Sequence, residues 1–364
     1  MRWPLRLPVA HNLARNRFTD NIILRLVDRE GTSGYGEGVA RDYVTGENTA
    51  QSLEALRRRL LPALLGRDLD PEGALQALAD LLPAEEADRH PAAFCALETA
   101  LLDLAGRRLG RSLAGFLGRP AQRPLVYSGV LPLAGPERSE ALLATMRQMG
   151  LEQVKVKLGP EGAYQRVAQA RRALGPGVRL RVDANGAWSA QQAVEIIASL
   201  EPLGVEAVEQ PVPKEDFAGL AWVRQRVKPL VLADESLCSP EHARRLIDMG
   251  AVDGFNIRLS KCGGAARSRR ILEMAGEASL VCQLGCQVGE LGLLTAAGRH
   301  FASCFPQLVY LEGSLTHFVV GRDVVKESLT FGPGGQAPPL AGQGLGVEVE
   351  LGILAPSQVF EMSI

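Results

Sequence analysis

The chain has 364 residues, enough for two domains or for one barrel with additions, and its 46% hydrophobic and 22% charged residues are typical of a soluble globular protein. A formal net charge of −1 gives no support for a nucleic-acid or anionic-membrane partner, and no stretch is apolar enough to span a membrane. The basic N-terminal segment lacks the apolar run of a signal peptide, and the six cysteines include no C-x-x-C pair, so we expect reduced thiols and a cytoplasmic location.

The first part of the chain is typical of an α+β domain. Residues 21–39 predict two strands joined by a turn that is rich in small residues. In residues 49–66, 70–82 and 90–118, apolar side chains recur at intervals of three and four, which predicts helices. We expect residues 1–120 to form one domain of this kind.

From about residue 124 the pattern changes to an alternation of strands and helices. Eight strand-like segments, most of them separated by helical segments, favour parallel pairing, and a closed (β/α) barrel over residues 121–315 is the best candidate. A doubly wound open sheet is the alternative, but no G-x-G-x-x-G sequence follows a first strand. Residues 316–364 are rich in glycine and proline, and we expect them to return over the surface to the N-terminal domain. The eight segments are PLVYSGVLP, EQVKVKLG, VRLRVDANG, VEAVEQPV, LVLADES, VDGFNIRLSK, LVCQLGC and QLVYLEGS.

Charged side chains stand at the ends of five successive predicted strands. Lys157, Asp183, Glu209, Asp234 and Lys261 follow one another at steps of 26, 26, 25 and 27 residues, as βα units of similar length produce. This spacing predicts that all five side chains lie at the same end of the sheet, on adjacent strands. In a barrel that end is the carboxyl-terminal rim, where enzymes of this architecture build their active sites.

Three neighbouring carboxylates repel one another unless a cation lies between them. All-oxygen ligand sets suit Mg²⁺, with Mn²⁺ as the alternative, whereas zinc usually recruits histidine or cysteine. None of the five histidines stands at these strand ends. Helix capping or surface ion pairing would explain one such carboxylate, but not three in register. We therefore expect Asp183, Glu209 and Asp234 to bind a divalent cation other than zinc.

Two lysines flank the three carboxylates in the predicted strand order. Lys157 and Lys261 would face each other across a bound metal, and a nearby cation lowers the pKa of a lysine until it can act as a base. Lys155 is two residues before Lys157 and therefore on the same strand face, where its charge would lower the pKa of Lys157 further. A metal that polarises a carboxylate, with a base on each face of the α-carbon, is suited to removing an α-proton and stabilising the enediolate.

The motifs KVK, VDANGAW, VEQP, ADES and SKCGG together resemble those of the enolase superfamily, in its muconate-lactonizing (mandelate racemase/muconate lactonizing enzyme) subgroup. GYGEGV and ALETALLDLAGRRLG resemble capping-domain segments of that family, so the resemblance covers nearly the whole chain. It implies a modified TIM barrel, (β/α)7β, that binds one Mg²⁺ and carries an α+β capping domain formed by the N-terminal block and the C-terminal tail. It also implies the following roles: metal ligands Asp183, Glu209 and Asp234; acid/base pair Lys157 and Lys261, supported by Lys155; and supporting positions Asn185 and Glu235.

The resemblance leaves the reaction open within the subgroup. Racemisation or epimerisation of an amino-acid derivative is our first choice, because two lysines permit proton transfer on either face. A muconate-type cycloisomerase, which needs only one lysine as acid/base, is the alternative, together with an o-succinylbenzoate synthase-like dehydratase. The eighth strand ends in Leu311-Glu312-Gly313, where the dipeptide epimerases that this sequence resembles carry an Asp-x-Asp that holds an ammonium group. The candidates for contacting the substrate are Glu312, Gln283, Gln287, and, from the loop of residues 40–47, Arg41 and Tyr43.

Two rival functions come from other classes of protein. A Schiff-base aldolase or lyase that uses Lys261 leaves the three carboxylates unexplained. A barrel that binds a metabolite without turnover predicts no solvent exchange at the α-carbon of its ligand. We expect a small-molecule carboxylate as substrate and neither a nucleic-acid nor a membrane partner, and the sequence is compatible with a homo-oligomer.

Overall fold

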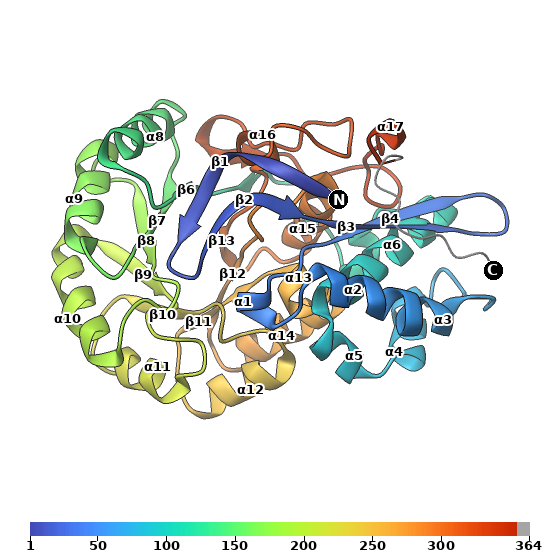
Figure 1. Cartoon of the computed structure of the whole chain (residues 1–364), viewed down its shortest axis with the longest axis horizontal. Helices are drawn as coiled ribbons and strands as arrows, with labels where there is room; N and C mark the ends of the chain where they lie inside the picture. The colour runs from blue at the N-terminus through green and yellow to red at the C-terminus, as the bar shows by residue number, and fades with distance from the viewer. Residues whose placement is uncertain (355–364) are drawn as a thin grey trace.

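The structure is a computed structural model that describes residues 1–354, with the side chains of these residues except 7–11 and 14–16. A ring of strands surrounded by helices forms the larger part of the molecule, and an α+β part packs against one side of it (Figure 1). Within the described residues, no helix has both the length and the apolar character needed to cross a membrane.

Eight parallel strands form the predicted barrel. Their order in the sheet follows the chain, and the amide of Ser128 closes the ring by donating to the carbonyl of Leu311 at 2.8 Å. A main helix lies between each pair of successive strands, so the (β/α)7β arrangement is confirmed (Figure 1). The strands are β6 (Gly129–Leu131), β7 (Gln153–Lys157), β8 (Arg179–Asp183), β9 (Val205–Glu209), β10 (Leu230–Ala233), β11 (Gly254–Ile257), β12 (Val281–Leu284) and β13 (Leu308–Leu311). The helices are α8 (Pro136–Gln148), α9 (Ala163–Leu174), α10 (Ala190–Leu200), α11 (Phe217–Arg224), α12 (Pro240–Asp248), α14 (Ala265–Glu277) and α15 (Gly292–Cys304), with the short turns η2 (Glu201–Leu203) and α13 (Leu259–Cys262).

The N-terminal part contains the predicted strands and helices and one hairpin that the sequence did not predict. This hairpin, β1 (Arg2–His11) and β2 (Ala14–Asp20), runs across the mouth of the barrel (Figure 1). The predicted pair of strands is β3 (Ile22–Val27) and β4 (Ser33–Gly38). The helices are α1 (Asp42–Thr45), α2 (Thr49–Ala55), the π-helix η1 (Leu56–Leu60), α3 (Leu61–Leu64), α4 (Ala74–Leu81), α5 (Ala84–Arg89), α6 (Pro91–Leu109) and α7 (Ala114–Leu117).

Three glycines let β4 lie directly on the buried helix α6. Gly34, Gly36 and Gly38 alternate along the strand and therefore share one face. A Cβ atom at these positions would lie only 2.0 to 2.3 Å from backbone oxygens of α6, so no larger residue fits without moving the helix. These oxygens belong to residues 92, 96 and 100, which recur at the four-residue spacing of one helix face. The glycines of this segment therefore serve packing between a strand and a helix.

Two buried carboxylates join the N-terminal part to the barrel. Glu98 of α6 accepts hydrogen bonds from the amides of Ala265 and Ala266 at 2.6 and 2.9 Å, at the start of α14. Glu37 of β4 accepts from Leu291 and Leu294 at 2.8 and 2.9 Å, at the start of α15. Each carboxyl group thus accepts hydrogen bonds from amides that a helix leaves unpaired in its first turn, at the positive end of the helix dipole.

Glu98 should make the stability of the fold depend on pH. Burial raises the pKa of Glu98 to about 7, above its ordinary value of 4.5, although two backbone amides favour the ionised form. Between these values the folded chain retains a proton that the unfolded chain has released, so the free energy of unfolding falls as the pH rises. Between pH 4.5 and 7, we expect the free energy of unfolding to fall by roughly 3 kcal/mol less in Glu98→Gln than in the wild-type chain. Urea unfolding at a series of pH values measures this difference. Glu161→Gln, at an exposed carboxylate, is the control, and an unchanged pH slope in Glu98→Gln would contradict the prediction.

The C-terminal segment contacts both parts. Its strand β14 (Gln336–Ala337) pairs with β5 (Leu125–Val126), and the amide of Leu345 donates to Asp103 of α6 at 2.7 Å. The remaining turns are α16 (Thr316–Val319), η3 (Pro333–Gly335) and α17 (Leu351–Leu354). The end of the tail, residues 355–364, lies outside the described residues.

Candidate active site

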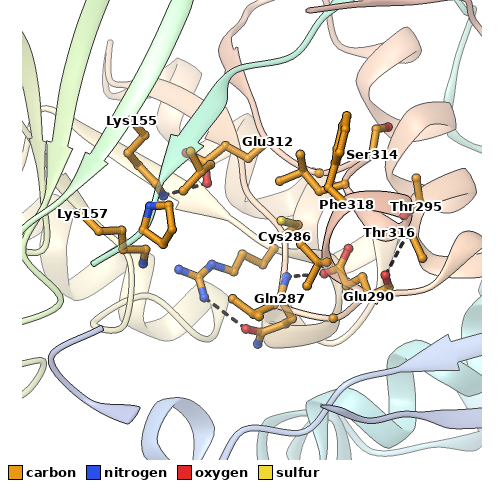
Figure 2. A pocket seen from close by; sticks show the side chains of 18 of the residues that line it. Lys155, Lys157, Cys286, Gln287, Glu290, Thr295, Glu312, Ser314, Thr316 and Phe318 are labelled. Atoms are coloured by element: carbon orange, nitrogen blue, oxygen red, sulfur yellow. Dashed lines mark hydrogen bonds and ion pairs between the residues drawn. The ribbon is translucent and has the colours of Figure 1, made fainter. Parts of the chain in front are cut away.

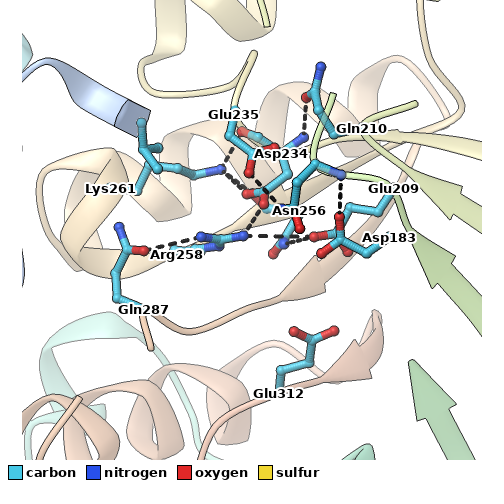
Figure 3. A network of polar contacts seen from close by, with 12 residues as sticks. Asp183, Glu209, Gln210, Asp234, Glu235, Asn256, Arg258, Lys261, Gln287 and Glu312 are labelled. Atoms are coloured by element: carbon cyan, nitrogen blue, oxygen red, sulfur yellow. Dashed lines mark hydrogen bonds and ion pairs between the residues drawn. The ribbon is translucent and has the colours of Figure 1, made fainter. Parts of the chain in front are cut away.

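Three carboxylates converge at the carboxyl-terminal rim of the barrel, in the order predicted from the sequence. Asp183 and Glu209 are the last residues of β8 and β9 and pair in register, and Asp234 directly follows β10. All three side chains are fully buried, and one oxygen from each lies within 4.8 Å of the other two (Figure 3). The cluster contains no nitrogen or sulfur ligand, so its chemistry fits a hard cation such as Mg²⁺.

Cationic side chains surround the carboxylates and keep Asp183 ionised. Burial alone would raise the pKa of Asp183, but Lys157 and Lys155 outweigh it and hold that pKa well below its ordinary value. Lys155 lies 3.1 Å from Glu209 and 3.4 Å from Asp183 and is almost completely buried. Although burial opposes its charge, the carboxylates raise the pKa of Lys155, which favours the charged ammonium form.

Lys157 and Lys261 lie on opposite sides of the carboxylates in the sheet order, as predicted. Lys157 ends β7, and its Nζ donates to Asp183 at 2.7 Å and to Asn185 at 2.9 Å. Lys261 donates to the side chain of Asp234 at 2.9 Å and to two backbone carbonyls (Figure 3). Burial, as the largest contribution, lowers the pKa of Lys261, which favours the neutral amine that a base requires.

The prediction that Lys261 closes a strand is wrong. Strand β11 ends at Ile257, and Lys261 stands on the one-turn helix α13 that follows. This turn brings the lysine back toward the sheet, where its amine reaches both Asp234 and the carbonyl of Asn256. The step of 27 residues from Asp234 to Lys261 stays close to the others, because the residues of this turn take the place of further strand residues.

Asn185 and Glu235 connect Asp183 to Lys157. The Asn185 amide oxygen accepts from Lys157, and its nitrogen donates to Glu235 at 2.8 Å. Its backbone amide donates to Asp183 at 2.9 Å. These bonds fix the direction of the Lys157 amine. Asn185 has φ = 45°, in the left-handed region that asparagine tolerates better than most residues, which allows the chain to turn directly after β8.

Two polar residues near the site were not predicted from the sequence: Asn256 in β11 and Arg258 directly after that strand. Asn256 donates to Glu209 at 2.8 Å, and Arg258 forms an ion pair with Asp234. Arg258 also donates to the Gln287 side chain at 3.1 Å. The signal was their spacing: two polar residues at alternate positions of an apolar strand, next to the strands that carry the three carboxylates. Because the strand was extended to Lys261, these positions were not read as facing the site.

A cavity of about 180 Å³ opens in front of these residues and reaches the loop after β12. Of the predicted substrate contacts, Tyr43, Gln287 and Glu312 line this cavity. Gln283 does not: its amide donates to Glu209 at 2.5 Å inside the barrel.

Two other predicted substrate contacts already have protein partners. Arg41, which is not among the described residues that line the cavity, donates to the carbonyl of Val288 at 2.5 Å and to Thr19 at 3.1 Å. It therefore connects the N-terminal part to the loop after β12. Glu312 forms ion pairs with Lys155 at 2.7 Å and Arg181 at 2.5 Å. These cations hold the pKa of Glu312 at about 2, although burial alone would raise it.

The chain matches two family models and several known proteins. The model described as mandelate racemase/muconate lactonizing enzyme, N-terminal domain, matches residues 1–118, and the one described as enolase C-terminal domain-like matches residues 138–352. N-succinyl-L-Arg/Lys racemase of Bacillus cereus is 30% identical over 83% of this chain and 81% of its own length. Its crystal structure matches with a TM-score of 0.90, at 28% identity, over 99% of this chain and 96% of that chain.

Relatives with different reactions show similar agreement. Muconate cycloisomerase 1 of Rhodococcus opacus is 29% identical over 91% of this chain and 88% of its own length. The crystal structure of dipeptide epimerase from Enterococcus faecalis, complexed with Mg and the dipeptide L-Leu-L-Tyr, matches with a TM-score of 0.86. It is 27% identical, over 95% of this chain and 97% of that chain.

Proposed function

The chain belongs to the mandelate racemase/muconate lactonizing enzyme family of the enolase superfamily, and we propose that it is a Mg²⁺-dependent isomerase that removes the proton α to a carboxylate. The reaction is racemisation or epimerisation of an amino-acid derivative through an enediolate. The observation that carries this proposal is the position of Lys157 and Lys261 on the two sides of three buried, convergent carboxylates.

The proposed roles follow from the contacts of each residue. Asp183, Glu209 and Asp234 would hold the metal, which when bound neutralises the substrate carboxylate and so lowers the pKa of the α-proton. Lys157 and Lys261 exchange protons with the α-carbon from its two faces, one as base and the other as acid. Asn185 and Glu235 orient Lys157, and Lys155 balances the negative charge between the ligands.

This proposal predicts deuterium uptake at the α-carbon. The protein is incubated in D₂O with Mg²⁺ and a set of N-acylamino acids, dipeptides and muconates, and deuterium uptake is measured by NMR. At least one amino-acid derivative should take up deuterium at its α-carbon. Deuterium should appear in both configurations, because each lysine serves one face. The same reaction with a chelator is the control. Turnover of a substrate without any exchange at its α-carbon would contradict the proposal.

Cycloisomerisation is the second candidate, favoured by the similarity to muconate cycloisomerase 1. That reaction needs only one lysine as acid/base, with the other acting as a charge. Product analysis separates the two candidates: a lactone ring forms or opens in a cycloisomerase, whereas an epimerase returns the same covalent structure with one inverted centre.

A further inference from the structure

The cavity has two chemically different ends. One end holds Lys155 and Lys157, next to the carboxylates (Figure 2). The other is formed by the loop after β12 and the start of α15 and α16, with Glu290 and the hydroxyl-bearing side chains of Thr295 and Thr316 (Figure 2). A substrate held at the first end therefore extends towards the second.

Glu290 has a carboxyl group without a cationic side-chain partner among the described residues. Its Oε1 accepts a hydrogen bond from the amide of Gln287 at 2.5 Å, and no lysine, arginine or histidine among the described residues forms an ion pair with it. Arg258 is paired with Asp234, and Arg41 is bound to neutral oxygens, so both act on Glu290 only through space. Burial raises the pKa of Glu290 to about 8, which reflects the cost of a carboxylate that lacks a partner.

Gln287 presents an unused donor to the same cavity. Its side-chain oxygen accepts from Arg258 at 3.1 Å, which fixes the amide so that Nε2 is the free group. Gln287 is only 2% exposed, and Nε2 has no hydrogen-bond partner in the described part of the chain. A buried N–H group without an acceptor is costly, so this position is suited to a ligand that brings one.

Glu312 is not available for the same task. Its two oxygens are paired with Lys155 and Arg181, whose charges together exceed its own. A cationic substrate group placed beside it would meet those two cations. Of Glu290 and Glu312, which both line the cavity, Glu290 is therefore the one that can accept a new cation.

We propose that Glu290 and Gln287 form a subsite for the amino-terminal aminoacyl group of a dipeptide-like substrate. Glu290 receives the ammonium group, and the Nε2 of Gln287 donates to the adjacent carbonyl. This assignment rests on the proposed function, because it takes the substrate carboxylate to lie at the metal site. It disfavours N-succinyl and muconate substrates, whose second carboxylate would face Glu290.

The path from Asp234 to Gln287 is short enough for such a substrate. Gln287 is connected to the metal-site carboxylate Asp234 through a single guanidinium, that of Arg258. Two extended residues span about 7 Å, so a dipeptide bound by its carboxylate reaches past one side chain of this size.

The test compares L-alanyl-L-alanine with its N-acetyl derivative in the α-exchange assay with Mg²⁺. The wild-type chain should prefer the free amine by roughly 30-fold or more in kcat/KM, because acetylation removes the charge that Glu290 would pair with. Glu290→Gln should abolish this preference. Gln287→Leu should slow both compounds to a similar extent, since both have the carbonyl. Glu98→Gln, which changes a buried carboxylate outside the cavity wall, should retain the preference.

Contrary results separate this inference from the proposed function. If Glu290→Gln kept the preference, or if the wild-type chain exchanged N-succinylalanine and the N-acetyl dipeptide as well as the free dipeptide, the subsite would be wrong while the enolising function stood. If no compound of the set exchanged its α-proton with Mg²⁺ present, the proposed function would fail, and the subsite with it.

Discussion

Lys157→Ala should stop the interconversion of substrate enantiomers but leave α-proton exchange intact for one of them, and Lys261→Ala should do the same for the other. Each amine lies on its own side of the carboxylates, so the loss of one removes proton transfer on one face of the α-carbon. General acid–base catalysis contributes roughly 10²- to 10⁴-fold, and we expect a decrease of this size for the affected enantiomer. Deuterium uptake by each pure enantiomer, followed by NMR, measures it.

The lysine variants need a control for damage to the metal site, because Lys157 also contacts Asp183. The rise in melting temperature with added Mg²⁺ should persist in both variants, since it reports binding to the folded chain and not catalysis. Lys228→Ala, at an exposed lysine on the barrel surface, should leave exchange unchanged. Equal loss for both enantiomers in one variant and no loss in the other would contradict the two-base assignment and favour cycloisomerisation.

The barrel could be predicted because its repeating unit leaves a regular trace in the sequence. Each strand and its helix use a similar number of residues, so Lys157, Asp183, Glu209 and Asp234 recur at nearly constant steps and meet at one rim. The hairpin β1–β2 leaves no such trace. Its strands contain arginines and prolines among the apolar residues, and its register shifts between Pro4 and Val9, so neither alternation nor a familiar turn motif marks it.

The residues around the three carboxylates were harder to predict, for a physical reason. Period-two alternation says which face of a strand a side chain occupies, but not whether its end reaches a cavity or another side chain. Gln283 was placed on the correct strand, yet its amide is used by Glu209. Arg41 stands in the expected loop, yet its guanidinium binds the carbonyl of Val288, a contact between residues 247 positions apart. Long-range partners of this kind have no local sequence signal.

The same limit applies to charge. The acidic residues could be recognised as a set because they stand in register, whereas Arg258 lies on a neighbouring strand end and was not connected with them. In the folded chain Arg258 pairs with Asp234 and comes within 3.8 Å of Glu209. Its role becomes visible only when the lengths of β11 and α13 are known, because these decide which side chains face the ligands.

Removing divalent cations should abolish α-proton exchange, and Mg²⁺ should restore it, with Mn²⁺ as a second metal to test. The metal would supply several kcal/mol of stabilisation to the developing negative charge, so we expect a loss of roughly 10³-fold or more without it. Asp183→Asn and Asp234→Asn should reproduce this loss with Mg²⁺ present, because each replaces one of three convergent carboxylate ligands by a neutral amide. Isothermal titration with Mg²⁺ measures the accompanying loss of affinity.

Glu206→Gln is the matched control, because Glu206 is on the same strand as Glu209 but pairs with Arg179 at the opposite end of the barrel. It should leave both Mg²⁺ affinity and exchange unchanged. If Asp183→Asn retained the affinity for Mg²⁺ and the exchange rate, the three carboxylates would be structural partners of the surrounding cations and not a metal centre. The ion pairs of Asp183 with Lys155 and Lys157 already neutralise its carboxylate, so a purely structural role is a real alternative. For this reason Mg²⁺ affinity and the exchange rate must be measured together.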